Sequence, residues 1–391
     1  MRGFSLCPAD VDVHLLFAEG ISQEFYDSAL SEWGSLRPEP LQLSQEELLA
    51  EQDEHTIYVL PLPDSGVVTD QPAPNFSHRL HVNDEAMGHE RLTVEVTMRM
   101  LAALAGQMSL FHAAALGNPQ THDAFILVGP SGQGKTTASR FLGKNFSYLS
   151  DETAIVDSSN HLRPYPKPLS VITDSAKPKE QIDPASVGIA AVAPDDFSFV
   201  LKHVILLDRR REQPVESPFF ERVDMADAVL EISQQTSGLL LTDDGVPRLL
   251  EVINACGGAL RLVYSEITET LPLFQKLLSG ELQIEPVLAE TSVIQDGSEP
   301  ETNHESGTGT SSDVVARIPG NTLYLLGDRA LLAQSAKLSE ISLFAADVWL
   351  TVEKPLTREE LKRALQELYG EIPAEDFQRV LTELIESKII R

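Results

Sequence analysis

One eight-residue segment has the residue types and spacing of a phosphate-binding loop. Residues 129–136 read Gly-Pro-Ser-Gly-Gln-Gly-Lys-Thr and fit the pattern G-x-x-x-x-G-K-[ST] at each specified position. Its glycines let backbone N–H groups approach phosphate oxygens, Lys135 can reach the β- and γ-phosphates, and Thr136 is the expected Mg²⁺ ligand. We therefore expect ATP and Mg²⁺ at this segment. The predicted nucleotide-binding residues are Gly129, Pro130, Ser131, Gly132, Gln133, Gly134, Lys135, Thr136 and Thr137.

The flanking residues predict the elements that position this loop. The apolar, β-branched run of 124–128 is typical of a buried strand, and 136–142 has the pattern of a helix start. Strand, loop and helix is the arrangement that a phosphate-binding loop requires, because the helix N-terminus adds partial positive charge. The sequence therefore predicts an α/β fold around a nucleotide.

An acidic pair follows the next predicted strand. Residues 146–149 are predicted as a strand, which places Asp151 and Glu152 at its carboxyl end, beside the phosphates of an α/β sheet. Asp151 could accept the proton of an acceptor hydroxyl or hold Mg²⁺. The pair could equally be turn or N-cap carboxylates.

A second acidic residue competes for the metal role. Asp208 closes the apolar run of 203–207, as the aspartate of a Walker-B strand does, although a strand can end in Asp simply because a turn begins there. The arginines at 209–211 follow directly. One of them could clamp a phosphate, or the three could form a solvated loop.

Composition narrows the set of partners. The 391-residue chain has a formal net charge of −29, which disfavours nucleic acid and anionic membranes because both attract basic proteins. Its two cysteines, Cys7 and Cys256, are too few for a disulfide framework. No apolar run is as long as a signal-peptide core or a membrane span. We expect a cytoplasmic protein.

Four regions follow from the patterning. Residues 1–90 form a β-rich region, and 91–284 form the domain that carries the loop. Residues 285–313 are acidic and poor in apolar side chains, which predicts a disordered linker. Residues 314–391 form a small α+β module of winged-helix type: a hairpin turning at Gly327, then three amphipathic helices, one with a capping box from Thr357.

Taken together, several segments resemble the kinases related to HPr serine kinase/phosphorylase. The segments are Phe111-His112-Ala113-Ala114-Ala115-Leu116, the loop itself, Tyr148-Leu149-Ser150-Asp151-Glu152 and Arg163-Pro164-Tyr165-Pro166-Lys167-Pro168-Leu169-Ser170. The resemblance covers about residues 90–280. It implies a phosphoenolpyruvate-carboxykinase-like nucleotide fold and self-association into an oligomer.

The same resemblance implies roles for individual residues. Asp151 would be the catalytic base, Lys135 and the loop amides the phosphate cradle, and Thr136, Asp151 and Glu152 the Mg²⁺ environment. His112 would lie near the active site, although a core or turn histidine has the same sequence signature. The chain departs from the family in having Asp-Glu where Asp-Asp is usual, and in lacking a Glu-x-Arg-Gly-x-Gly signature. HPr is therefore a poor guess as substrate.

The C-terminal module resembles the PqqD-like domains, which bind peptides by adding a strand to a sheet edge. The combination predicts a kinase that phosphorylates a hydroxyl, such as a serine of a recruited peptide or a related small molecule. Two alternatives remain open. One is a nucleotide-binding regulatory or assembly protein whose main activity is peptide binding, and the other is a Walker-type ATPase that uses Asp208.

Overall fold

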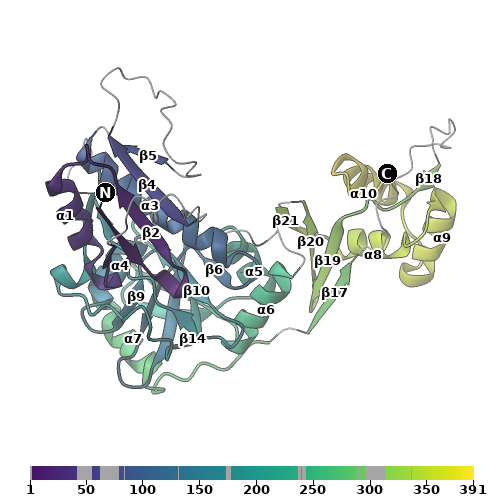
Figure 1. Cartoon of the computed structure of the whole chain (residues 1–391). Helices are drawn as coiled ribbons and strands as arrows, with labels where there is room; N and C mark the ends of the chain where they lie inside the picture. The colour runs from purple at the N-terminus through teal and green to yellow at the C-terminus, as the bar shows by residue number, and fades with distance from the viewer. Residues whose placement is uncertain are drawn as a thin grey trace. The chain divides into compact units, whose positions relative to one another are not determined.

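The computed structural model describes residues 2–41, 55–61, 79–82, 84–130, 132–172, 178–236, 239, 244–288, 290–295, 313–335 and 337–391. The chain divides into two compact units. Unit 1 comprises Met1–Val223, Gln235–Leu239 and Pro247–Pro286, and unit 2 comprises Asp224–Gln234, Leu240–Val246 and Val287–Arg391. Strands and helices alternate along unit 1, so the predicted mixed α/β class is confirmed (Figure 1).

The N-terminal part of unit 1 is a five-stranded sheet with the order β3-β1-β2-β4-β5. β1 is antiparallel to β2 and β3, whereas β2, β4 and β5 run parallel. Alternate side chains face opposite sides, so Leu15 and Phe17 enter the main core while Leu16 packs on the other face. The strands are β1 (Arg2–Leu6), β2 (Val13–Phe17), β3 (Glu39–Leu41), β4 (Thr56–Pro61) and β5 (Arg79–Val82).

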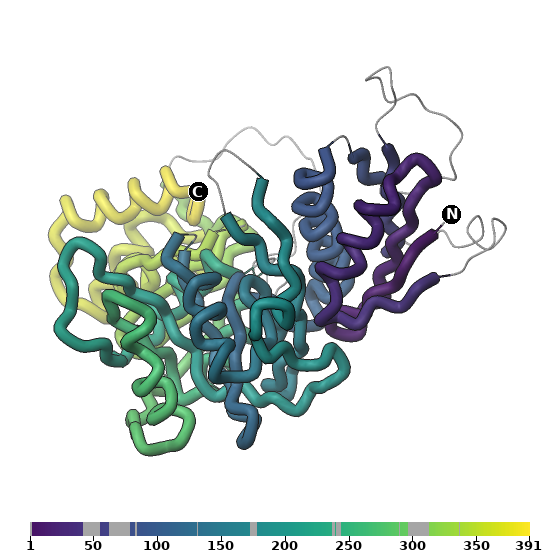
Figure 2. The backbone as a smooth tube through the Cα atoms, turned by 90° about the vertical axis from the view of Figure 1, so that its left-hand side faces the viewer, coloured from purple at the N-terminus to yellow at the C-terminus, as the bar shows by residue number. Residues whose placement is uncertain are grey.

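Two helices, α1 (Gln23–Glu32) and α3 (Glu85–Leu104), cover this sheet. Asp84 caps α3 by accepting a hydrogen bond from the Met87 N–H at 3.0 Å. Figure 2 shows α1 and α3 beside the purple strands. The same core includes Ile155 and Tyr165, so the sheet, α3 and the loop-bearing part share one hydrophobic core. The predicted boundary at residue 90 therefore falls inside α3.

The loop-bearing part of unit 1 is built on a six-stranded sheet with the order β15-β16-β14-β8-β7-β9. β14 runs parallel to β8 and β16, and the remaining pairs are antiparallel. The strands are β7 (Ala113–Gly117), β8 (Asp123–Val128), β9 (Ser147–Ser150), β14 (Val200–Arg209), β15 (Phe219–Arg222) and β16 (Ala259–Tyr264).

Helices α4 (Lys135–Leu142) and α7 (Leu271–Leu278) pack on this sheet around Phe125 and Phe274. The rings of these two phenylalanines stack at 4.6 Å between centroids. α6 (Gly245–Ala255) precedes β16. Five short strands complete the unit: β6 (Ser109–Phe111), β10 (Ala154–Val156), β11 (Leu162–Arg163), β12 (Leu169–Val171) and β13 (Glu180–Ile182).

Unit 2 combines a four-stranded antiparallel sheet, ordered β17-β19-β20-β21, with helices around Trp349. The Thr357 capping box is present as predicted, and Gly370 is the C-cap of the same helix. The elements are α5 (Met225–Ser233), β17 (Thr291–Gln295), β18 (Val314–Val315), β19 (Asn321–Leu326), β20 (Arg329–Gln334), β21 (Lys337–Ile341), α8 (Leu343–Thr351), β22 (Leu356–Thr357), α9 (Arg358–Tyr369) and α10 (Ala374–Glu386).

The sheet of unit 2 changes the prediction for the linker. Residues 291–295, inside the predicted linker of 285–313, form β17 and pair with β19 in antiparallel register. The partner strand β19 lies about thirty residues further along the chain. Its backbone hydrogen bonds hold residues 291–295 in a strand, although their own composition gives little driving force for folding. Within the predicted linker, residues 289 and 296–312 lie outside the described residues.

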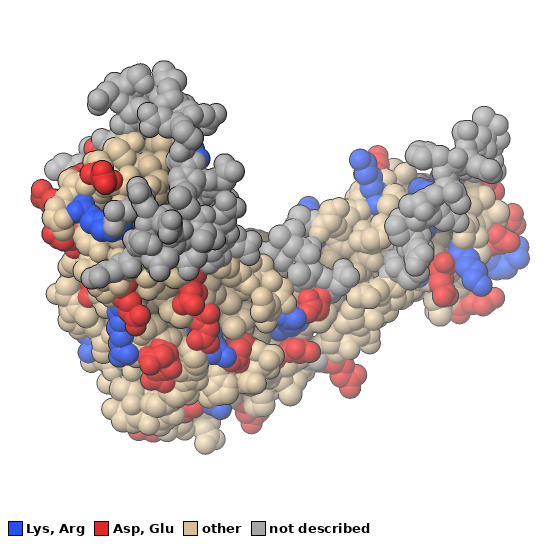
Figure 3. Space-filling view, in the orientation of Figure 1, with Lys and Arg blue, Asp and Glu red and all other residues tan. Residues whose placement is uncertain are grey.

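The surface agrees with the acidic composition. Figure 3 shows acidic side chains spread over the visible face of unit 1 with basic ones among them, rather than a continuous basic surface of the kind that nucleic acids bind. Within the described ranges, no helix combines the length and the apolar character needed to cross a bilayer.

Candidate functional site

The loop at 129–134 joins β8 to α4 at the carboxyl end of the parallel pair formed by β8 and β14. Gly132 and Gly134 have φ angles of +85° and +96°, which other residues rarely adopt. Tyr264 donates a hydrogen bond to the Gln133 carbonyl, and Arg211 donates one to the Gly132 carbonyl, each at 3.1 Å. Two residues distant in sequence therefore fix the loop. Ser131 lies outside the described residues.

Lys135 is the first residue of α4 and is buried. Its ammonium donates hydrogen bonds to the carbonyl oxygens of Gly129 at 2.6 Å and Pro130 at 3.4 Å. Burial lowers the pKa of Lys135 from its usual value, and the nearby carboxylates of Glu152 and Asp151 partly offset that shift. The lysine is thus held within its own loop, beside the acidic pair.

Asp151 follows β9 and is almost fully buried among hydrogen-bonding partners. Tyr148 donates to its carboxylate at 3.1 Å, and the Lys167 ammonium lies 3.7 Å from the same oxygen. The Ser150 hydroxyl accepts a hydrogen bond from the Thr153 N–H at 3.0 Å and so shapes the turn that carries the acid. Burial and the adjacent carboxylate raise the pKa of Tyr148 well above its usual value, so its hydroxyl stays a donor.

Lys167 links the two carboxylates. Its side chain is only 1% exposed and lies 2.9 Å from Glu152 as well as 3.7 Å from Asp151. Burial alone would lower its pKa, but the two carboxylates reverse this and raise it. Burial also raises the pKa of Glu152, and the Lys167 ammonium more than compensates, leaving that pKa below its usual value. The cluster therefore holds ionised groups of both signs.

One cavity of about 440 Å³ is lined by the loop, by Lys135 and by the acidic pair of Asp151 and Glu152. Cationic side chains dominate its wall, whereas Asp151 and Glu152 are the acids that line it. Such a surplus of positive charge next to loop amides suits a polyphosphate. The lining residues are His112, Gly132, Gly134, Lys135, Thr136, Thr137, Arg140, Asp151, Glu152, Ser170, Val171, Ile172, Lys179, Arg209 and Arg211.

The cavity also places the remaining predicted residues. His112 lies in the wall, and burial followed by the Lys135 charge lowers its pKa, which favours a neutral imidazole. Thr136 and Thr137 line the same space. Nothing in the sequence indicates that Arg140 and Lys179 line the site, because neither belongs to a motif. Lys167 is part of the Pro-Tyr-Pro-Lys-Pro segment but had no predicted role of its own.

Asp208 has a different setting. The strand that carries it, β14, continues through Arg209, one residue beyond the end predicted at Asp208. The Asp208 carboxylate is paired with Arg210 at 2.6 Å, and the residue lines a neighbouring cavity with Gly132 and Gln133. Arg209 makes a bidentate pair with Glu266 at 3.2 and 3.0 Å. Arg211 is the arginine of this run that hydrogen bonds to the loop. Asp208 therefore does not join the cluster of Asp151.

The fit to Mg²⁺ rests on the donor set. No group of three or more His, Cys, Asp or Glu side chains with metal-binding proximity occurs among the residues that the structure describes. Mg²⁺ at phosphate sites needs only one or two carboxylates, since waters and phosphate oxygens supply the other ligands. Thr136, Asp151 and Glu152 line one cavity and offer a hydroxyl and two carboxylates. This donor set fits the ion.

Comparisons with known proteins give a limited result. No protein-family model matches the sequence, and neither does any curated protein. Among solved structures, the chain is similar to one described as the Hpr(Ser) kinase/phosphatase from Coxiella burnetii. The identity is 14% over 44% of this chain and 94% of that chain, with a TM-score of 0.22.

Proposed function

We propose that the protein is an ATP- and Mg²⁺-dependent kinase that transfers a phosphoryl group to a hydroxyl. One observation carries the proposal: a single cavity brings the glycine-rich loop, Lys135 and Thr136 together with the buried Asp151. Phosphoryl transfer needs positioning and charge neutralisation more than covalent participation by the protein, and this cavity offers both. The family resemblance of the motifs agrees with this reading.

Different residues of the cavity have different roles in the proposed phosphoryl transfer. The loop amides and Lys135 bind the phosphates of ATP, and Arg211 and Arg140 add positive charge beside them. The acceptor oxygen forms a bond to the γ-phosphorus as the bond from phosphorus to the ADP oxygen breaks, and the hydroxyl proton passes to the Asp151 carboxylate. Tyr148 and Lys167 hold that carboxylate in place. Mg²⁺ held by Thr136, Asp151 and Glu152 would neutralise phosphate charge.

Mass spectrometry of the reaction products tests the proposal. The full chain is incubated with ATP, Mg²⁺ and serine-containing peptides, above all any short peptide encoded beside this protein. A mass gain of one phosphate on a hydroxyl, together with one ADP per phosphate transferred, supports the kinase. ADP and free phosphate without a phosphorylated acceptor would instead favour an ATPase.

Lys135→Ala provides a prediction for the donor half of the site. Removing the ammonium takes away charge-assisted hydrogen bonds worth about 1.5–3 kcal/mol each, so ATP should bind roughly tenfold to a hundredfold more weakly. Isothermal titration calorimetry with ATP and Mg²⁺ measures the change. Lys144→Ala is the control, since Lys144 follows the same helix but lies outside the cavity. Equal losses in the two variants would contradict the assignment.

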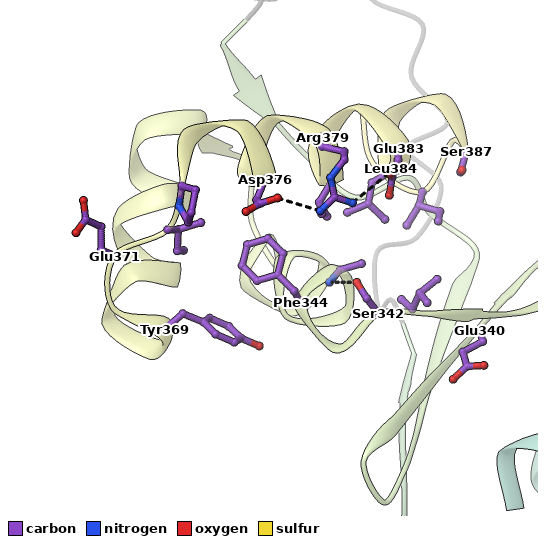
Figure 4. Close-up of a pocket in the computed structure, with 16 residues that line it drawn as sticks. Glu340, Ser342, Phe344, Tyr369, Glu371, Asp376, Arg379, Glu383, Leu384 and Ser387 are labelled. Atoms are coloured by element: carbon purple, nitrogen blue, oxygen red, sulfur yellow. Dashed lines mark hydrogen bonds and ion pairs between the residues drawn. The ribbon is translucent and has the colours of Figure 1, made fainter. Parts of the chain in front are cut away.

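The second part of the proposal is that unit 2 recruits a peptide in the manner of PqqD-like domains. A groove of about 670 Å³ lies between β21 and α10, and within the described residues β21 is an outer strand of its sheet (Figure 4). Strand addition to such an edge supplies backbone hydrogen bonds, while the groove accepts side chains. Glu340, Glu371, Asp376 and Glu383 outnumber Arg379 on its wall, which favours a peptide with basic residues.

Tyr369→Ala tests this groove. Tyr369 packs edge-to-face against Phe344 at 5.3 Å between ring centroids, and both rings line the groove. Loss of such an aromatic contact should weaken peptide binding about fivefold or more, as measured by fluorescence anisotropy. Leu368→Ala is the matched control, because Leu368 is its exposed neighbour and does not line the groove. Similar affinities for both variants would contradict the role of the groove.

A further inference from the structure

A second cavity, of about 230 Å³, adjoins the one that contains the loop. The two share four wall residues, which are His112, Glu152, Ser170 and Lys179. Beyond this shared wall the second cavity changes character, because its far side is formed by apolar side chains of α3 and β6. We propose that it binds the acceptor, and that the acceptor is a peptide segment whose hydroxyl-bearing residue has an aliphatic neighbour. This inference rests on the proposed kinase activity.

Helix α3 supplies the apolar wall. Its inner face, with Leu92, Val96 and Met100, is fully buried in the core of unit 1. On another face, Val94 and Met98 are 55% and 53% exposed, lie one turn apart and line the cavity. Leu101, Leu110 and Phe111 continue the apolar wall. A neighbouring aliphatic group would remove this surface from water, whereas a polar group would lose its hydration there.

The wall is fixed relative to the acidic pair. Thr97, which also lines the cavity, forms a hydrogen bond with the Tyr165 hydroxyl at 2.8 Å. Tyr165 is fully buried and precedes Lys167 by two residues, and Lys167 contacts both carboxylates. The apolar side chains of α3 and the reacting end of the site are therefore held by one continuous set of contacts. A peptide whose aliphatic side chain binds the apolar wall therefore has its hydroxyl positioned relative to the acidic pair by the same contacts.

The size and polarity of the cavity define the occupant. Sites for drug-sized molecules occupy about 300–1,000 Å³, so a cavity of about 230 Å³ accommodates a short peptide segment rather than a larger ligand. The buried Lys167 and the Glu152 carboxylate lie at the polar end and can meet a hydroxyl and its backbone groups. At the rim, Lys179 pairs with Glu90 at 3.7 Å, which satisfies both charges without a charged ligand. A serine next to a leucine-sized residue matches this arrangement.

Two synthetic peptides and four variants of the full chain test the inference. One peptide has a single serine between two leucines, and the other has asparagine in place of each leucine. The wild-type chain should use the leucine peptide with a kcat/KM about tenfold higher or more. Val94→Asp and Met98→Asp should raise KM for the leucine peptide about tenfold and abolish that preference. Val94→Thr keeps the side-chain volume but adds a hydroxyl. It should therefore raise KM and weaken the leucine preference in the same way, but to a smaller extent.

Met87→Asp is the matched control. Met87 lies on the same helix and is similarly exposed, at 47%, but does not line the cavity, so its variant should keep the leucine preference. Equal use of the two peptides by the wild-type chain, or an unchanged preference in Val94→Asp and Met98→Asp, would contradict the proposed acceptor site. Neither result would contradict the proposed kinase activity. Phosphorylation of free serine as efficient as that of the leucine peptide would also overturn it. Failure to phosphorylate any hydroxyl would contradict the proposed kinase activity itself.

Discussion

Asp151→Asn is expected to lower phosphoryl transfer by about two to four orders of magnitude, while ATP affinity stays within about threefold. The amide keeps the shape of the side chain, and its oxygen can still accept the hydrogen bond from Tyr148 and lie near the Lys167 ammonium, both of which contact one carboxylate oxygen of Asp151. It cannot accept a proton from the acceptor hydroxyl. The loss should therefore appear in kcat for the acceptor, measured by single-turnover transfer from radiolabelled ATP, with nucleotide affinity measured in parallel.

Asp208→Asn is the matched control for this prediction. Both aspartates lie at the carboxyl end of a strand near the loop, Asp151 directly after β9 and Asp208 as the next-to-last residue of β14, but Asp208 is paired with Arg210 and does not line the cavity that contains Asp151. We expect Asp208→Asn to change transfer less than about fivefold, since it touches neither the acceptor nor the acidic cluster. A larger loss from Asp208→Asn than from Asp151→Asn would contradict the kinase and favour an ATPase that uses Asp208. Unchanged transfer in both variants would contradict the role of Asp151 as the catalytic base.

The parts of the site that sequence could predict are those determined by neighbouring residues. The apolar run before Gly129 and the Gly-Lys-Thr that follows Gln133 set a strand, a turn with positive φ and a helix start within fifteen residues. The capping box at Thr357 is local in the same sense. The strands that end at Asp151 and Asp208 could be predicted for the same reason.

The choice between Asp151 and Asp208 could not be predicted from these local patterns. It depends on Lys167 and Arg210, which place one aspartate in a buried cluster and neutralise the other. Lys167 is buried because the segment after Arg163 crosses the acidic turn, where the Tyr165 N–H bonds to the Leu149 carbonyl at 2.9 Å. A lysine is rarely buried without a partner, and its partners here lie fifteen residues away in sequence.

Longer-range packing explains the other differences. Nothing in the sequence around α3 indicates that Val94 and Met98 line a cavity beside Glu152. In the same way, strand β17 could not be inferred from Thr291–Gln295, because its order comes from pairing with β19. Contacts with distant segments, rather than the composition of the segment itself, decide such cases.

Lys167→Met is expected to destabilise unit 1 by about 3–5 kcal/mol. Methionine can fill the volume of the lysine stem, so the loss comes from the charge: the Asp151 carboxyl group, whose side chain is 2% exposed, would be left buried without its cationic partner. Glu152 is 48% exposed and can be solvated, so its pair with Lys167 adds little. The free energy of unfolding is measured by urea denaturation.

The positions of the two tryptophans allow the unfolding of unit 1 to be measured separately from that of unit 2. Trp33 is fully buried in unit 1 and Trp349 is fully buried in unit 2, so fluorescence in a Trp349→Phe background reports the unfolding of unit 1. Lys179→Met is the matched control, because Lys179 also lies 3.7 Å from a carboxylate, that of Glu90, but both side chains are substantially exposed. That variant should lose less than about 1 kcal/mol. Equal losses for the two lysines would show that burial does not set the strength of the Lys167 contacts.

A double variant separates the charge effect from a packing effect. If an unpaired Asp151 carboxylate causes the loss, then Lys167→Met combined with Asp151→Asn should be more stable than Lys167→Met alone, because no buried charge is left without a partner. If lost packing causes it, the second substitution should add to the first. Only the first outcome agrees with a cluster in which Lys167 compensates the charge of Asp151.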